Sequence, residues 1–242
     1  MSVQVWCQTD VGLKRLNNED SFLMDPDLGL YVIADGMGGH SGGEVASQMA
    51  VQIVREVIIE SYEKDAGIKP ADLLSRAYSI ASQKIYEKSL SMSDLKGMGT
   101  TLVVALIRDD RIYFANVGDS RAYLMTSSGL WQVTEDHSLV NEQIKAGIIR
   151  EENKNRAHKN IITRSVGFEK NIACDIVERK LDIGDSYIIC TDGLSGMIED
   201  QEIFHIASES EPDRVVSLLI EQAKNNGGLD NVTVMYMNVI EN

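Results

Sequence analysis

Short apolar runs dominate the hydrophobic pattern of the chain and predict mostly β-strands. The most continuous run covers residues 100–107 and is rich in Val and Leu, which is typical of a strand buried on both faces. Further strands are predicted at residues 3–7, 28–34, 111–117, 121–125, 173–180, 187–190 and 231–239. The Gly118-Asp119-Ser120 segment is predicted to form the turn between two of these strands.

Helical periodicity is strong in two long segments, residues 44–60 and the segment that begins at Pro70. In each segment apolar residues recur three or four positions apart, which places them on one face of a helix. These residues are Val45, Met49, Ile53 and Val57 in the first segment, and Leu74, Ala77, Ala81 and Ile85 in the second. Shorter helices are predicted at residues 139–146, 202–207 and 213–223.

The order of these elements predicts the fold class. Strands come in blocks rather than in strict alternation with helices, which favours an α+β fold with mostly antiparallel sheets. We therefore expect a central β-sandwich of two antiparallel sheets, flanked by helices on both sides. Only three prolines occur and no linker is evident, so residues 1–242 are predicted to form one domain. The polar residues 135–165 are predicted to form a small surface flap on it.

Composition narrows the possible partners and the compartment. A net charge of -14 disfavours nucleic acid and anionic membranes as partners, because their phosphates are repelled. Apolar runs are too short to span a bilayer, and we expect no signal peptide. The three cysteines do not have the spacing of a disulfide framework or a thiolate zinc site. We expect them to pack as small apolar residues in a protein of the reducing cytoplasm.

Four aspartates stand beside or close to glycine at predicted strand ends. Asp35 and Asp192 follow apolar runs and precede glycine, Asp119 follows Gly118, and Asp230 lies just before the last predicted strand. Strand ends hold side chains rigidly, and a neighbouring glycine allows the backbone to approach closely. Carboxylate oxygens in such positions suit Mg²⁺ or Mn²⁺. Asp-Gly is also a common turn dipeptide, so the pattern alone indicates a carboxylate metal site and nothing narrower.

Two other kinds of site do not fit the sequence. The glycine-rich loop after residue 34 lacks the third glycine of a dinucleotide-binding motif, since Ser41 stands in its place. A cysteine phosphatase needs an arginine six residues after the nucleophilic cysteine. Those positions hold Leu13, Lys180 and Gly196.

A series of short motifs between about residues 3 and 238 resembles the metal-dependent protein phosphatase family, also called protein phosphatase 2C. The compact length and the Asp-Gly-Met-Gly-Gly sequence are similar to its bacterial branch. The motifs are Val11-Gly12 with Arg15, Asn18-Glu19-Asp20, Asp35-Gly36-Met37-Gly38-Gly39-His40, Met98-Gly99-Thr100-Thr101, Asn116-Val117-Gly118-Asp119-Ser120-Arg121, Ile162-Thr163-Arg164-Ser165-Val166-Gly167, Thr191-Asp192-Gly193-Leu194 and Asp230-Asn231-Val232-Thr233. The resemblance implies the same sandwich fold.

The resemblance also implies a metal centre of two to three Mn or Mg ions. Asp35 would bridge two ions with the Gly36 carbonyl as a further ligand, and Asp192 and Asp230 would complete the pair. Asp119 together with Asp192 matches the third-ion site of bacterial members.

Three further residues receive roles from the resemblance. Glu19 and Asp20 would hold metal-bound waters. Arg15 would bind the substrate phosphate, since a planar guanidinium matches two phosphate oxygens at once.

The implied reaction is hydrolysis of phosphoserine and phosphothreonine in proteins. A water shared by two cations would lose a proton near neutral pH and attack phosphorus in line. Animal-type members often carry a histidine where Met37 stands, so either a water on the third ion or His40 would protonate the leaving oxygen. We expect His137 and His158 to be polar surface residues of the flap.

The resemblance implies phosphorylated proteins as partners, and by analogy a serine/threonine kinase that the enzyme opposes. We expect a monomer. Two alternatives stay open: a catalytically inactive binding or regulatory module on the same fold, and a small-molecule phosphoesterase. An inactive module usually lacks one of the metal-binding aspartates, and here all four are present.

Overall fold

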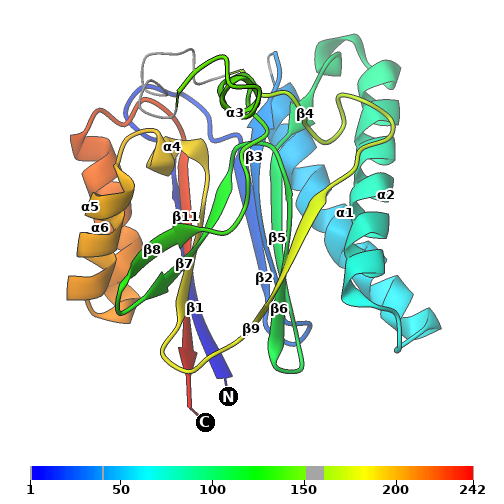
Figure 1. The fold of residues 1–242 in the computed structure, drawn as a ribbon. Helices are drawn as coiled ribbons and strands as arrows, with labels where there is room; N and C mark the ends of the chain where they lie inside the picture. The colour runs from blue at the N-terminus through cyan, green and yellow to red at the C-terminus, as the bar shows by residue number, and fades with distance from the viewer. Residues whose placement is uncertain (1, 40, 151–160, 242) are drawn as a thin grey trace.

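Two antiparallel β-sheets face each other in the computed structural model, and helices cover the outer face of each sheet (Figure 1). The structure describes residues 2–39, 41–150 and 161–241. The first sheet has the strand order β1 (Ser2–Asp10), β11 (Val232–Ile240), β10 (Ser186–Cys190), β7 (Arg121–Thr126) and β8 (Gly129–Gln132). The second has the order β2 (Asp20–Asp25), β3 (Leu30–Met37), β5 (Leu102–Arg108), β6 (Arg111–Val117) and β9 (Asp175–Lys180), and the short β4 (Gly99–Thr100) pairs with β3. The predicted sandwich is thereby confirmed.

The helices form the two outer layers. The long helices α1 (Gly42–Lys64) and α2 (Pro70–Ser91) lie against the second sheet, and the 3-10 turn η1 (Ser93–Leu95) follows them. The helices α5 (Asp200–Glu209) and α6 (Pro212–Asn225) lie against the first sheet. The short helices α3 (Leu139–Lys145) and α4 (Asp192–Ser195) lie at one end of the sandwich (Figure 1).

Strand β3 shows why its sequence is apolar at successive positions. Leu30, Val32 and Ala34 pack under the α1 and α2 layer, whereas Tyr31 and Ile33 pack between the two sheets. Successive side chains of a strand point to opposite faces, so a strand with a layer on each side buries all of them. The same alternation in β5 confirms the prediction that it is buried on both faces.

The buried face of α2 is the predicted one, but that of α1 is displaced. Ala46, Ala50 and Val54 are fully buried, whereas the predicted Val45 and Met49 are only partly buried. Small side chains let a helix axis approach a sheet closely, so the alanines lie at the centre of the contact. A pattern that counts only large apolar residues misses this displacement.

Several elements differ from the prediction. The strands β2 and β8 and the helix α4 were not predicted, because they are short and contain many polar residues. The strands β2 and β8 form as hairpins with their neighbours in sequence, β3 and β7. The start of the predicted surface flap, residues 135–138, is largely buried. Cys190 is buried, and Cys7 and Cys174 are partly buried. Within the described residues, no helix is long and apolar enough to cross a membrane.

Candidate metal and phosphate site

Asp35 is held by its backbone on both sides. The sequence predicted it at the end of a strand, but β3 continues to Met37, so Asp35 lies within the strand. Its N–H donates to Thr101 Oγ1 at 2.9 Å, and its carbonyl accepts from the backbone N–H of Thr101 and from Thr100 Oγ1, both at 2.8 Å. These bonds fix the backbone to neighbouring strand residues, so the carboxylate stands on a rigid support.

Asp20 lies opposite Asp35 in the β2–β3 pair and connects the two sheets. Its Oδ2 accepts hydrogen bonds from Thr191 Oγ1 at 3.0 Å and from Thr233 Oγ1 at 2.6 Å, both on the side of the first sheet. Asp20 is buried at 8% exposure. The sequence motif Asn18-Glu19-Asp20 therefore places a carboxylate at the junction of the sheets.

Asp192 and Asp230 come together because α4 begins directly against the segment before β11. A Cβ atom on Gly193 would collide with the carbonyl oxygen of Asn231, so glycine is required at this position. This agrees with the prediction that glycine beside the carboxylate permits a close approach of the backbone. Asp192 and Asp230 interact electrostatically with each other, and Asp192 also contacts Asp35.

Asp119 lies in the turn between β6 and β7 and is 8% exposed. Its Oδ1 is buried and has no hydrogen-bond partner among the described residues. A buried carboxylate oxygen without a donor is costly in free energy, which indicates that its partner is a bound ion or water rather than a protein group. Asp119 also lies within electrostatic range of Asp35 and Asp192.

These carboxylates cannot all be ionised easily near neutral pH. Burial, and next the mutual repulsion of the carboxylates, raise the pKa of Asp35 well above its ordinary value. Burial raises the pKa of Asp20 and of Asp119 to about 7, with further repulsion from Asp192. Burial and the charge of Asp230 also raise the pKa of Asp192. A divalent cation among these groups would remove the repulsion.

The predicted donors fit Mg²⁺ or Mn²⁺ with water completing the coordination. The prediction names carboxylate oxygens and the backbone carbonyl of Gly36, which follows Asp35, and hard oxygen donors suit these ions. In the described ranges, no three His, Cys, Asp or Glu side chains are close enough together to hold one ion by themselves. Ions of this kind commonly keep several waters, so such an open arrangement is suitable for them.

Arg15 stands at the rim of the carboxylate group. Its Nη2 donates to Asp230 Oδ2 at 2.7 Å, and its side chain is 51% exposed. The hydrogen bond to Asp230 raises the pKa of Arg15, so its charge is permanent. Burial raises the pKa of the nearby Glu19, and the charge of Arg15 partly opposes this.

Asn231 holds the loop that carries Arg15. Its Nδ2 donates to the carbonyls of Val11 at 3.0 Å and Asn17 at 2.9 Å, and its Oδ1 accepts from the N–H of Glu19 at 2.8 Å. Asn231 itself is buried. One side chain therefore ties residues 11–19 to the segment that carries Asp230.

A cavity of about 700 Å³ opens from the carboxylates. Its lining includes Asp119, Asp192 and Asp230, together with Asp136, Ser138 and Val140 and with residues 195–201. The cavity therefore connects the carboxylate group with the base of the predicted flap.

Arg121 and Asp136 form a largely buried ion pair beside this cavity. Arg121 ends one of the sequence motifs but received no role from it, and Asp136 was not singled out. Arg121 donates from Nε to Asp136 Oδ1 at 2.9 Å and from Nη2 to Asp136 Oδ2 at 2.7 Å. Its Nη1 donates to the hydroxyl of Tyr123, which donates in turn to Asp200. Asp136 lies in a polar segment, and only tertiary contacts bury it.

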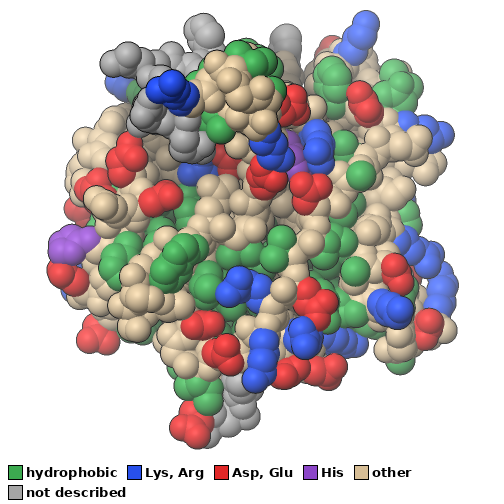
Figure 2. Space-filling model, viewed as in Figure 1, with side chains coloured by type: hydrophobic (Ala, Val, Ile, Leu, Met, Phe, Trp, Pro, Cys, Tyr) green, Lys and Arg blue, Asp and Glu red, His purple; other side chains and the backbone are tan. Residues whose placement is uncertain are grey.

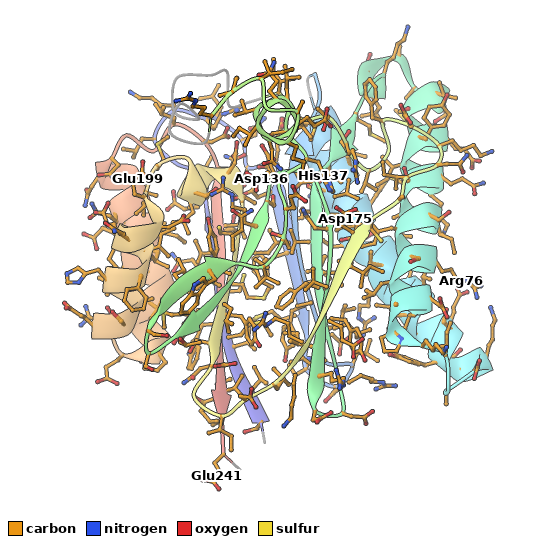
Figure 3. All side chains as sticks on the ribbon, viewed as in Figure 1. Arg76, Asp136, His137, Asp175, Glu199 and Glu241 are labelled. Atoms are coloured by element: carbon orange, nitrogen blue, oxygen red, sulfur yellow. The ribbon has the colours of Figure 1, made fainter. Side chains whose placement is uncertain are left out.

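The prediction that His137 is a polar surface residue of the flap was wrong. Its side chain is 5% exposed, and it lies beside Asp136 and Asp175 at the end of the sandwich that carries the carboxylates (Figure 3). His40 and His158 lie outside the described residues.

The antiparallel sandwich with buried carboxylates at one end and an arginine beside them defines the class of metal-dependent phosphatases. The family model described as Protein phosphatase 2C matches residues 13–225. The chain belongs to the protein phosphatase 2C family, which is metal-dependent, and the predicted resemblance is confirmed.

Three relatives illustrate the similarity. The chain is 39% identical over 239 residues to a putative protein phosphatase 2C-type from Streptococcus pyogenes, covering 96% of each chain. It superposes on the serine/threonine phosphatase PstP/Ppp of Mycobacterium tuberculosis with a TM-score of 0.91 at 31% identity, covering 100% of both chains. It also superposes on the catalytic domain of the serine/threonine phosphatase PstP with 2 manganese ions, with a TM-score of 0.88 at 32% identity and 99% of each chain covered.

Proposed function

We propose that this chain hydrolyses phosphoserine and phosphothreonine in proteins, with two to three manganese or magnesium ions. The convergence of Asp35, Asp192, Asp230 and Asp119 in one repulsive, partly buried group supports this most directly. The family and the serine/threonine phosphatases among its relatives give the reaction type. The 2 manganese ions of one relative support the metal.

The metal-holding residues in this proposal are Asp35, the Gly36 carbonyl, Asp192 and Asp230, with Asp119 and Asp192 at a third ion. When bound, the ions would supply a water that is deprotonated near neutral pH and positive charge for the phosphoryl oxygens. The chain's own task is to keep repelling carboxylates together. The rigid β3 strand and the close contact at Gly193 do this.

Arg15 would bind the phosphate at the rim of this group. Its guanidinium already donates to Asp230, so it is aimed at the place where a phosphoryl oxygen would meet the metal-holding residues. Glu19 and Asp20 would orient waters in the site, and the two threonine hydroxyls on Asp20 hold that carboxylate in one position.

Position 37 cannot supply the proton that the leaving oxygen needs, because the thioether of Met37 has none to give. His137 is also unsuitable, since both of its ring nitrogens are engaged by other residues. We propose that water in the site protonates the leaving oxygen.

The cavity beside the carboxylates would receive the chain on either side of the phosphorylated residue. We further propose that residues 1–242 act as one catalytic domain with a flap at about residues 135–165, as a monomer. Its substrates would be products of a serine/threonine kinase. The cysteine spacing, which does not fit a disulfide framework, is the reason to propose that the protein acts in the reducing cytoplasm.

The test is phosphate release from a phosphothreonine peptide with manganese, with EDTA, and with the Asp230→Asn variant. Asp213→Asn is the matched control, since Asp213 is exposed on the distant α6. We expect metal-dependent release that Asp230→Asn lowers by at least about 100-fold, within the range found when one charge-stabilising group is removed. Asp213→Asn should match the unchanged protein.

The outcomes also separate the alternatives. No release with any divalent metal, despite an intact fold, would favour an inactive binding module. Faster release from sugar or nucleotide phosphates than from phosphopeptides would favour a small-molecule phosphoesterase. Full activity of Asp230→Asn would contradict the assigned metal site.

A further inference from the structure

The turn that carries Asp119 is held at the preceding residue by His137. The N–H of Gly118 donates to His137 Nδ1 at 3.1 Å, and the carbonyl of Gly118 accepts from the backbone N–H of His137 at 2.9 Å. Gly118 has a φ of 107°, a conformation that other residues rarely adopt, and a Cβ there would collide with Thr101. The conformation of this turn is therefore restricted at Gly118, and the two hydrogen bonds to His137 hold it in place.

The geometry fixes which ring nitrogen of His137 carries the proton. A backbone N–H can only donate, so Nδ1 accepts from Gly118 and carries no proton. Nε2 therefore carries the proton and donates to Asp175 Oδ2 at 3.1 Å. Arg164 donates to the other oxygen of Asp175, also at 3.1 Å, which holds that carboxylate from a second side.

His137 also joins the base of the predicted flap to this turn. Its carbonyl accepts from the N–H of Thr163 at 2.9 Å, and the neighbouring Leu139 N–H donates to the carbonyl of Ile161 at 2.8 Å. The described ends of the flap are thus paired with each other where His137 meets Gly118. Figure 3 shows His137 and Asp175 close together at this end of the sheets.

We propose that His137 is a positioning residue for Asp119 and that it acts through the backbone of Gly118. By holding the turn in one conformation, His137 directs the Asp119 carboxylate, whose Oδ1 has no partner among the described residues, towards a divalent cation. Asp175 supports this by fixing the ring and its tautomer. The inference rests on the proposed function in one respect, namely that Asp119 binds a cation.

The test measures Mn²⁺ binding to the whole chain by isothermal titration calorimetry, with thermal unfolding of the metal-free protein as a check of the fold. Two substitutions of His137, by asparagine and by glutamine, test the contacts of the two ring nitrogens one at a time. Asparagine at position 137 places its amide oxygen near Nδ1 and can accept from Gly118. Glutamine places its amide near Nε2 and leaves the Gly118 N–H without an acceptor. His205→Gln, on the exposed α5 surface, is the matched control.

The Asp119→Ala variant first identifies the binding event that depends on Asp119. We expect His137→Gln to weaken that event by about 10-fold or more, as is usual for residues that support metal ligands, and His137→Asn to stay within about 3-fold of the unchanged protein. In the Asp119→Ala background, His137→Gln should cause no further loss of Mn²⁺ binding, because both changes act on one interaction.

Equal weakening by His137→Asn and His137→Gln would overturn the inference, because the acceptor at Nδ1 would then not matter. The inference would also be overturned if His137→Gln weakened Mn²⁺ binding as much in the Asp119→Ala background as in the unchanged protein. His137 would then act on a site other than that of Asp119. If Asp119→Ala itself left Mn²⁺ binding unchanged, the metal role of Asp119 would fail first and this inference with it.

Discussion

At the scale of single residues, the carboxylate site opposes the stability of the metal-free protein. Asp35, Asp20 and Asp119 are ionised in the unfolded chain at neutral pH, but burial and repulsion raise their pKa values in the folded state. A carboxylate with a raised folded-state pKa lowers the free energy of unfolding at any pH above its ordinary value. Cations that bind only the folded state would reverse this penalty.

The Asp35→Asn variant should therefore be more stable than the unchanged protein when metal is absent. We expect its free energy of unfolding in EDTA to rise by about 1 kcal/mol, because asparagine does not titrate and so removes the cost of the raised carboxyl pKa. The unchanged protein should gain about 2.7 kcal/mol at Mn²⁺ 100 times its Kd, and Asp35→Asn should gain little. Urea unfolding with EDTA and with manganese measures both. A variant less stable in EDTA, yet fully stabilised by manganese, would contradict the assignment.

At the scale of elements, the two sheets are joined at the site by polar contacts. Asp20 on β2 accepts from Thr233 on β11 and from Thr191, which directly follows β10, and Thr233 also bonds to Thr9 on β1. Elsewhere the two sheets meet through apolar side chains such as Tyr31 and Met235. Buried polar contacts depend on direction, so they fix how the sheets are aligned where the carboxylates must converge.

Replacing Thr233 by valine keeps the volume but removes a hydrogen bond to a buried carboxylate. We expect Thr233→Val to lower the free energy of unfolding by about 1–3 kcal/mol, because Asp20 loses a donor that it cannot replace. Thr126→Val, at the far end of β7, removes only exposed hydrogen bonds to Ser128 and should change it by less than about 0.5 kcal/mol. Urea denaturation in EDTA measures both variants. Equal effects of the two would show that the link through Asp20 has no special importance.

At the scale of the whole molecule, charge favours one kind of substrate. The net charge is -14, and acidic side chains are spread among basic ones over the face seen in Figure 2. Glu199 and Asp200 line the cavity. Arg121 is the one basic residue among the described lining, and Asp136 already pairs with it. A substrate segment with basic residues beside the phosphorylated residue would be attracted to this cavity.

Phosphothreonine peptides with lysine or arginine near the phosphorylated residue should be hydrolysed faster than matched peptides with glutamate there. We expect kcat/KM to differ by about 10-fold at low salt and the difference to shrink as salt is added. Glu199→Lys should reduce this preference. Glu241→Lys makes the same charge change at the opposite end of the molecule and should not (Figure 3).

Rates on p-nitrophenyl phosphate, which has no flanking residues, are the reference for each variant. A preference that Glu199→Lys and Glu241→Lys reduce equally would show that overall charge, and not the cavity, attracts the substrate.

The sequence by itself determined the layers of the fold and singled out the aspartates that the structure brings together. Continuous apolar strands such as residues 30–34 require a layer on each face, and Asp-Gly pairs mark where the backbone must approach closely. Only the tertiary structure decided that Asp136 and His137 are buried and that Asn231 holds the loop of Arg15. These roles depend on contacts between segments far apart in the chain, and neither periodicity nor residue type along the sequence records such contacts.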